Sequence, residues 1–235
     1  MYAYYRCEFT YERLMEVTMY KYTKIETIYM RDTEGTKHLI EGSFRSDAIE
    51  FLKDLEWYGT EKIDGTNIGI YWDGHNISFQ GRTERAQIPA DLINKLTEMF
   101  LNVETEELFE QTFGEKPVVL FGEGYGAKIQ KGGGNYIPDG VSFILFDVYM
   151  PESNTWLRRE AIENIAQAFG VDVVPIVYRG NLDGAVKFVK SHPMSTIGKA
   201  EMEGIVCKPA YELLDRNGSR VIVKIKWEDF KDRCA

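Results

Sequence analysis

The segment Glu61-Lys62-Ile63-Asp64-Gly65-Thr66-Asn67 decides how the rest of this chain is interpreted. It places a lysine two residues before Asp-Gly, within a run from 61 to 72 that predicts one strand. In that run Ile68, Ile70 and Trp72 alternate and therefore share one face. A Lys-x-Asp-Gly sequence arises by chance in roughly one chain of this size in twenty. Alone it is equally well explained as a strand that ends in a turn, so its meaning depends on its companions.

The flanking sequence predicts more strands than helices, and most of the strands follow one another along the chain. Helices are predicted from Ser46 or Asp47 to about 55, and over 89–101, about 102–112, 158–169 and 182–192. Further strands are predicted over 77–81, 118–123, 142–150, 172–178, 203–208 and 220–226. This order favours a mixed α+β fold with antiparallel sheets, since a doubly wound sheet needs sustained alternation of strands and helices.

Composition indicates a globular protein with one large domain or two small ones. The chain has 235 residues, of which 44% are hydrophobic and 28% charged, and its net charge is −9. That balance argues against a protein coated in basic residues, although Lys and Arg gather over 187–233 while 104–110 is acidic. No run approaches the roughly 18 apolar residues of a membrane span, and a secretory signal is not apparent. The three cysteines are scattered, which together with these features predicts a reducing cytoplasm.

Transfer of a nucleotide onto a lysine sets requirements that other residues must meet. The amine must lose its proton, although a lysine ordinarily titrates near about 10.4, and nearby positive charge lowers that pKa. The triphosphate needs cations, and a metal ion needs oxygen ligands. The base needs an aromatic surface, and the ribose needs a carboxylate or an amide.

Three carboxylates lie where packing alone explains them poorly. Glu123 stands between two glycines at the end of an apolar strand. Asp147 follows Phe146 inside a predicted buried strand, so its charge must find partners. Glu203 opens a strand and is followed by Gly204, which permits a ligand to approach the backbone, although a glutamate at a strand start is usually a surface residue.

Cations complete the set. Lys224 and Lys226 are two residues apart on a predicted strand, so both project from one face. Arg82 stands at the end of the strand that pairs with the segment after Lys62. The glycine-rich loop 128–134 either contacts phosphates through its lysines and backbone N–H groups or is a flexible surface loop, and the residues leave both interpretations open.

In order and spacing these residues resemble the covalent nucleotidyltransferase superfamily of RNA ligases, DNA ligases and mRNA capping enzymes. Its motifs match Lys62-Ile-Asp-Gly, Phe121-Gly-Glu-Gly, Phe146-Asp147, Glu203-Gly-Ile-Val and Lys224-Ile-Lys226. The Lys-Ile-Asp-Gly-Thr-Asn segment with Glu61 before it is similar to the RNA ligase 2 branch, whereas DNA ligases and capping enzymes usually have arginine at the position of Asn67. The resemblance implies an adenylyltransferase fold of antiparallel sheets flanked by helices.

The resemblance also implies roles at the matching positions. Lys62 would form a covalent lysyl-AMP, with Glu203 bound to Mg²⁺ or Mn²⁺ and with Lys224 and Lys226 on the phosphates of ATP. The other residues implied to contact or position the nucleotide are Glu61, Asn67, Arg82, Glu123 and Phe146. Asp64 and Asp147 would support the site. The implied reaction transfers AMP to the 5′-phosphate of RNA, a nicked duplex or an RNA/DNA hybrid among the candidates, and then seals it to a 3′-hydroxyl.

Two departures from the family keep alternatives open. The chain ends nine residues after Lys226, so we expect one adenylation domain over 1–235 without the OB domain of DNA ligases and capping enzymes. Residues 1–45 form a tyrosine-rich leader that we expect to pack on this domain and to compensate for the missing module. The alternatives are a compact ATP-dependent DNA ligase, a GTP-using capping enzyme, and an RNA-repair subunit that becomes adenylated but needs a partner for sealing.

Overall fold

Two β-sheets that face each other form the frame of the molecule, and the computed structural model describes residues 19–36, 38–83 and 85–231. The six-stranded sheet has the order β10-β8-β7-β5-β6, with β9 paired to β8. Its strands are β5 (Thr66–Trp72), β6 (Ile77–Gly81), β7 (Val118–Gly126), β8 (Val141–Met150), β9 (Thr155–Trp156) and β10 (Asp172–Val173). The five-stranded sheet has the order β1-β13-β12-β4-β11. Its strands are β1 (Glu26–Thr27), β4 (Trp57–Glu61), β11 (Ile176–Gly180), β12 (Gly204–Pro209) and β13 (Val223–Lys226).

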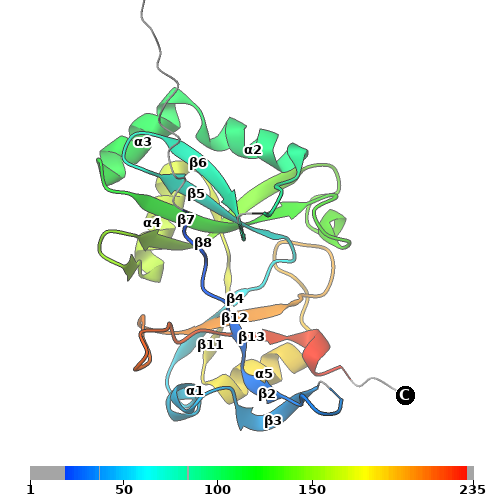
Figure 1. Cartoon of the computed structure of the whole chain (residues 1–235). Coiled ribbons are helices and arrows are strands. Elements are labelled where there is room, and N and C mark those ends of the chain that lie inside the picture. The colour runs from blue at the N-terminus through cyan, green and yellow to red at the C-terminus, as the bar shows by residue number, and fades with distance from the viewer. Residues whose placement is uncertain (1–18, 37, 84, 232–235) are drawn as a thin grey trace, which may run out of the picture.

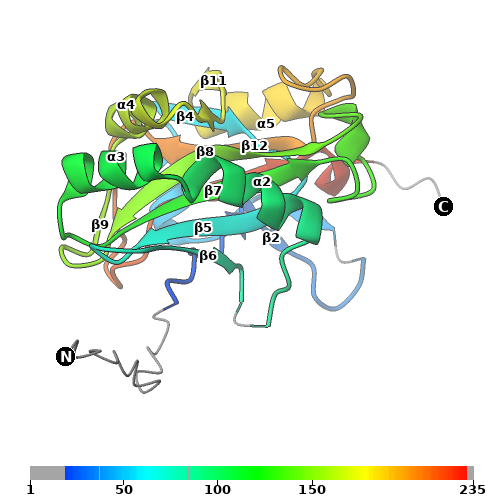
Figure 2. The ribbon, with the colours of Figure 1, turned by 90° about the horizontal axis from the view of Figure 1, so that it is seen from above.

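Helices cover the outer side of each sheet (Figure 1). Helices α2 (Ala90–Phe100), α3 (Val103–Phe113) and α4 (Arg159–Phe169) pack on the six-stranded sheet, and Figure 2 shows α2 and α3 lying over it. Helices α1 (Asp47–Leu52) and α5 (Leu182–Lys190) pack on the five-stranded sheet beside the hairpin of β2 (Tyr29–Arg31) and β3 (Leu39–Phe44). Two 3₁₀ turns, η1 (Gly133–Asn135) and η2 (Trp227–Asp229), complete the elements. The prediction of an α+β fold with antiparallel sheets is confirmed, with parallel pairing only where β1 meets β13 and β10 meets β8 within the described residues.

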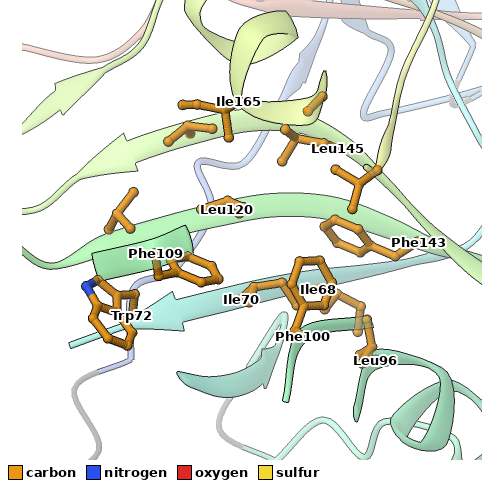
Figure 3. Packing of buried hydrophobic residues seen from close by; sticks show 14 of the residues in the cluster. Ile68, Ile70, Trp72, Leu96, Phe100, Phe109, Leu120, Phe143, Leu145 and Ile165 are labelled. Atoms are coloured by element: carbon orange, nitrogen blue, oxygen red, sulfur yellow. The ribbon is translucent and has the colours of Figure 1, made fainter. Parts of the chain in front are cut away.

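Strand alternation separates two outer cores from a smaller inner one. Ile68, Ile70 and Trp72 share one face, as predicted, and this face meets the helices; Figure 3 shows Trp72 beside Phe109 in that outer core. A second outer core lies between the five-stranded sheet and α5. The inner cluster between the sheets is small, with Ile63, Tyr125, Ile144 and Val174 at its centre. The inner faces of the sheets therefore retain polar side chains, and these build the site.

Two of the predicted strands are wrong in the same way, because each is two strands in different sheets. The predicted strand 61–72 breaks at residues 62–65, where the chain leaves β4 and enters β5. The predicted strand 172–178 breaks at 174–175 between β10 and β11, at a proline that cannot donate a backbone hydrogen bond. The two crossings lie together, since the Glu61 backbone N–H donates to the Pro175 carbonyl at 3.0 Å.

The segment before β4 holds strands that were not predicted. The first 18 residues of the expected leader lie outside the described residues, and the rest passes from one sheet to the other (blue in Figure 1). Tyr20 packs on Tyr71 and Tyr149 of the six-stranded sheet, whereas β1 pairs with β13 of the five-stranded sheet. These residues thus pack on both sheets, while the single-domain boundary at 1–235 stays a prediction. Within the described residues, no helix is long and apolar enough to cross a membrane.

Candidate active site

Lys62 occupies the crossing between the two sheets. Its backbone N–H donates to the Gly204 carbonyl at 2.9 Å, which fixes the lysine beside the start of β12. Its Nζ donates to Glu203 Oε2 at 2.6 Å. The other oxygen of Glu203 pairs with Lys226 Nζ at 2.8 Å, and Lys226 also pairs with Glu228 at 2.5 Å. Two lysines therefore share one carboxylate, and three of the predicted site residues are brought together.

Gly65 allows the segment after Lys62 to touch β7. A Cβ at position 65 would lie 2.3 Å from the Gly124 carbonyl oxygen and 2.8 Å from Glu123 Cγ, closer than any side chain tolerates. The Gly65 carbonyl also accepts a hydrogen bond from Gln130 Nε2 at 3.0 Å. The glycine-rich loop is thus packed against the Lys-Ile-Asp-Gly turn at Gln130, and contact of its lysines with nucleic acid stays a prediction.

Glu123 projects from β7 into the space between the sheets. Burial raises the pKa of its carboxyl to about 8, with Glu203 and Asp64 adding to the rise and Lys62 and Arg82 opposing it. Burial and the charge of Glu203 likewise raise the pKa of Asp64. Glu123 is half-buried at the cavity wall and its carboxyl has no hydrogen-bond partner among the described residues, so it is poised to hydrogen-bond a hydroxyl of a ligand.

A β-bulge places both Phe146 and Asp147 on the inner side of the six-stranded sheet. Phe121 pairs with Asp147 and Gly122 pairs with Leu145, so Phe146 is the extra residue. Before the bulge Leu145 belongs to the outer core, and after it Val148 does, whereas Phe146 packs on the inner cluster. Bulges re-aim side chains near functional sites, and this one brings an aromatic ring and a carboxylate to the same face.

Asp147 is the centre of a buried charge network that joins the two sheets. Its carboxylate accepts from Lys208 Nζ at 2.6 Å and from Arg220 at 3.0 and 3.3 Å. Burial opposes its charge, but Lys208 and Arg220 hold the pKa of Asp147 below its ordinary value. Arg220 also pairs with Glu212 at 2.5 Å. Asp147 thus links β8 to β12 and to the segment before β13, and its supporting role in the site stays a prediction.

Tyr22 completes this network from the leader. Its hydroxyl donates to Asp147, and its ring meets Phe146 edge-on with the centroids 5.0 Å apart. Burial, followed by the charge of Asp147, raises the pKa of the Tyr22 hydroxyl, so the tyrosine stays a donor. Tyr22, Lys208 and Arg220 are site residues that the sequence reasoning missed. The only sequence signal was the buried acid at 147, which required partners without identifying them.

A central cavity of about 380 Å³ lies between the sheets. Among the predicted site residues, its lining includes Glu61, Lys62, Asn67, Arg82, Glu123, Phe146 and Lys224. Near Phe146 the wall is formed by Ile63, Val174 and Val206, which are apolar, while Thr60 and Lys208 add polar atoms. The cavity therefore has an apolar part beside an aromatic ring and a charged part beside Lys62, a division typical of sites for an aromatic base and its phosphates.

Two expectations about individual residues are narrowed by the structure. The Glu61 carboxylate already has partners in the protein, because it accepts from Thr196 N at 2.9 Å, from Thr196 Oγ1 at 2.6 Å and from Ser195 Oγ. Glu61 still lines the central cavity, so its contact with a nucleotide stays a prediction. Gly204 permits a close approach of backbone rather than of ligand, since a Cβ there would lie 2.1 Å from the Ile225 carbonyl oxygen.

Two smaller cavities adjoin the central one. Asp64 and Glu203 line a polar cavity of about 150 Å³. Lys224 lines both the central cavity and a side cavity of about 350 Å³, which Lys226 also lines. Burial, then Lys226, Lys62 and Arg82, lower the pKa of Lys224, so this amine is surrounded by like charge. Such a cluster of cations attracts an anion.

The residues present fit a divalent metal that is held mainly by a bound ligand. Within the described residues no group of three His, Cys, Asp or Glu side chains is arranged to hold a metal ion. Mg²⁺ needs no such cage, since it is usually bound by one or two carboxylates, several waters and the phosphates of a substrate. Glu203, with Asp64 beside it at the same cavity, supplies the carboxylates of that arrangement.

Two facing sheets with an ion-paired lysine at their crossing, a half-buried glutamate and an aromatic ring are the features of a covalent nucleotidyltransferase. The chain belongs to the RNA ligase family, whose model matches residues 55–226.

Solved structures of Naegleria gruberi RNA ligase show the same fold. A mutant with ATP and Mn matches with a TM-score of 0.61 and 20% identity over 78% of this chain. A mutant with AMP and Mn has a TM-score of 0.65 and 19% identity over 90% of this chain. The ligase with pyrophosphate has a TM-score of 0.60 and 19% identity over 89% of this chain. The chain covers 52%, 57% and 62% of these proteins, respectively, so it spans less than two thirds of their length.

Proposed function

We propose that this protein is an ATP-dependent RNA ligase that uses Lys62 as its nucleophile. The Lys62 amine attacks the α-phosphorus of ATP, a P–N bond forms, the bond from the α-phosphorus to the bridging oxygen breaks, and pyrophosphate leaves. AMP then passes from Lys62 to the 5′-phosphate of RNA, and a 3′-hydroxyl displaces AMP to seal the strand. The observation that carries the proposal is the Lys62–Glu203–Lys226 chain at the charged end of a cavity whose other end is apolar.

Different walls of the cavity contact the base, the ribose and the phosphates of the nucleotide. Phe146, with Val206 also on the wall, suits the adenine ring, because aromatic and apolar surfaces bury a base. The protonated Glu123 carboxyl can exchange hydrogen bonds with the ribose hydroxyls. Lys224 and Lys226 neutralise the charge that the phosphates develop as pyrophosphate leaves, which is the main demand of phosphoryl transfer. Asn67 and Arg82 stand at the same cavity and help to position the nucleotide and the attacking end.

The ion pair between Lys62 and Glu203 must be broken before attack, because the amine needs a free lone pair to act as a nucleophile. Glu203 holds the Lys62 amine at 2.6 Å while also holding Lys226 at 2.8 Å. A divalent cation that takes over the Glu203 carboxylate would remove this partner from Lys62 and add positive charge beside it, and both changes favour loss of the proton. Mg²⁺ or Mn²⁺ held by Glu203 and the phosphates would supply charge neutralisation at the same place.

Labelling of the protein tests the first step. The protein is incubated with α-labelled ATP and Mg²⁺, and label that remains on denatured protein is measured. We expect wild type to be labelled, Lys62→Ala to be unlabelled, and Lys95→Ala to behave as wild type, because Lys95 is paired with Glu98 on α2 away from the cavity. Absence of label from ATP and from GTP contradicts the proposal, and label from GTP alone favours a capping enzyme.

Sealing assays test the later steps. Nicked duplexes with RNA or only DNA at the ends, and single-stranded RNA, are compared as substrates for the labelled protein. Sealing that requires RNA supports the RNA ligase, and equal sealing of all-DNA nicks supports the compact DNA ligase. Labelled protein that seals none of them is the adenylation-competent repair subunit, which then needs a partner.

A further inference from the structure

The side cavity shares Ile25 and Lys224 with the central cavity and is built largely from residues before the family match. Lys24, Arg31 and Arg45 bring cations to it from the leader, and Lys224 and Lys226 bring them from β13. The carboxylates at the same cavity are Glu26, Glu228 and Asp229. Five cations thus face three carboxylates around a volume of about 350 Å³. The excess of positive charge at a concave site indicates an anionic ligand.

Most of these cations pair with carboxylates of the protein, which a bound anionic ligand would have to replace. Glu26 pairs with Lys24 at 2.9 Å and with Arg45 at 3.3 Å. Arg31 pairs with Asp229 at 2.6 Å. Lys24 and Arg45 are well exposed, with 72% and 39% of their side chains accessible, so both can turn toward a ligand. Exposed pairs of this kind contribute little to stability, which leaves these cations free to exchange partners.

Lys224 connects this cavity to the proposed nucleotide site. It lines both cavities, and among the described residues it forms no ion pair. Parallel pairing of β1 with β13 places Glu26 opposite Val223 and Thr27 opposite Lys224, so the leader cations are fixed in register with the active-site lysine. A phosphate chain that passes Lys224 would therefore continue into the side cavity.

We propose that the side cavity is a second phosphate-binding subsite, formed by Lys24, Arg45 and Lys224, for phosphate groups beyond the one that reacts with Lys62. This inference rests on the proposed function and extends it to leader residues outside 55–226. The phosphates have two sources, which share their chemistry: the pyrophosphate end of ATP, or the backbone of the RNA. Glu26 is the internal competitor of the ligand, because it holds two of the cations.

The test compares variants that change the charge of the cavity in opposite directions. Lys24→Gln combined with Arg45→Gln removes two cations, whereas Glu26→Gln releases them. Lys190→Gln is the matched control, since Lys190 pairs with Glu41 at 2.6 Å outside both cavities. Labelling with α-labelled ATP is measured first, so that failure of the proposed function appears as unlabelled wild type. Thermal unfolding of each variant confirms that the protein is folded.

Two arms then distinguish the sources. In the first arm, pyrophosphate is added to labelled protein, and the concentration that releases half of the AMP as ATP is measured. In the second arm, binding of a short 5′-phosphorylated RNA is followed by fluorescence anisotropy over a range of salt concentrations. In one arm we expect the double variant to raise the measured pyrophosphate concentration or RNA dissociation constant about tenfold, and Glu26→Gln to lower the same quantity about threefold. If RNA is the ligand, the slope of log affinity against log salt also falls by about 0.7 for each lost contact.

Each outcome supports or overturns the proposal. A change in the pyrophosphate arm assigns the subsite to the triphosphate, and a change in the RNA arm assigns it to the polynucleotide. Labelled wild type with a double variant that matches it in both arms overturns the proposal. If Glu26→Gln loses as much pyrophosphate or RNA binding as the double variant, the proposal is also overturned, because the charges then have a structural role. An equal loss of binding with Lys190→Gln overturns the proposal as well.

Discussion

Replacement of Asp147 by asparagine should destabilise the protein more than any exposed charge change. The Asp147 carboxylate is fully buried and partners two cations, Lys208 and Arg220, whose side chains are 7% and 3% accessible. Asparagine keeps the size of the side chain but leaves those cations, among the described residues, with Glu212 as their one remaining charged partner. Breaking a buried ion pair by removing one partner costs about 3–5 kcal/mol. We expect a loss in this range from a total stability of about 5–15 kcal/mol.

Urea denaturation followed by tryptophan fluorescence measures this loss. Trp156 lies 4.1 Å from the Arg220 guanidinium, so its emission reports on the network directly. The control is Glu98→Gln, which removes one side of the Lys95–Glu98 pair on the surface of α2 and should cost about 0.5 kcal/mol or less. Adding Lys208→Met to Asp147→Asn should recover part of the loss, because one buried cation is then removed as well. A loss below about 1 kcal/mol for Asp147→Asn would refute the reasoning.

Three further changes test the site. The folded pKa of Glu123 is raised to about 8 from an ordinary value near about 4.3, so its stabilising contribution is full below the ordinary pKa and is lost as the pH rises through about 8. Between pH 5 and 9 the unfolding free energy of Glu123→Gln should therefore rise by about 2–4 kcal/mol relative to that of wild type. Unfolding free energies of the two proteins that stay parallel over this range would contradict the assignment. Gly65→Ala should abolish labelling from ATP, since its Cβ would lie 2.3 Å from the Gly124 carbonyl, and wild-type labelling would show that the turn can move. Tyr22→Phe removes the hydrogen bond to Asp147 but keeps the ring, so we expect a loss of about 1–3 kcal/mol in urea unfolding with little change in the spectrum of the folded protein.

The sequence predicted those parts of the fold that depend on local patterns. The faces of β5 and β13 followed from alternation. Ile68 and Ile70 of β5 lie in the outer core of the six-stranded sheet, and Val223 and Ile225 of β13 lie in that of the five-stranded sheet, so Lys224 and Lys226 face away from it. Alternation could not reveal the crossings at Lys62 and Pro175, because apolar periodicity continues while the chain changes sheets. The short strand β1 was missed because its parallel pairing with β13 depends on residues far away in the sequence.

The site was predicted to the extent that single residue types carry a requirement. A buried acid needs partners, so Asp147 was recognised, but its partners Lys208, Arg220 and Tyr22 come from three distant segments. The bulge that turns Phe146 and Asp147 to the same side has no sequence signal, because it depends on pairing with β7. Glu61 was expected at the nucleotide, and only the position of the Ser195–Thr196 turn shows that its carboxylate already has partners within the protein.

The crossing at Lys62 has a consequence for how ligand binding and folding are coupled. Lys62 lies at the crossing and Glu203 directly before β12, Lys224 and Lys226 lie on β13 of the five-stranded sheet, and Glu123 and Phe146 lie on the six-stranded one. A nucleotide in the cavity would contact residues of both sheets and so link one sheet to the other. Its binding energy is then added to the work of pulling the sheets apart, by RT ln(1 + [L]/Kd) for free ligand. Resistance to separation of the sheets thus becomes a measure of nucleotide occupancy that does not depend on turnover.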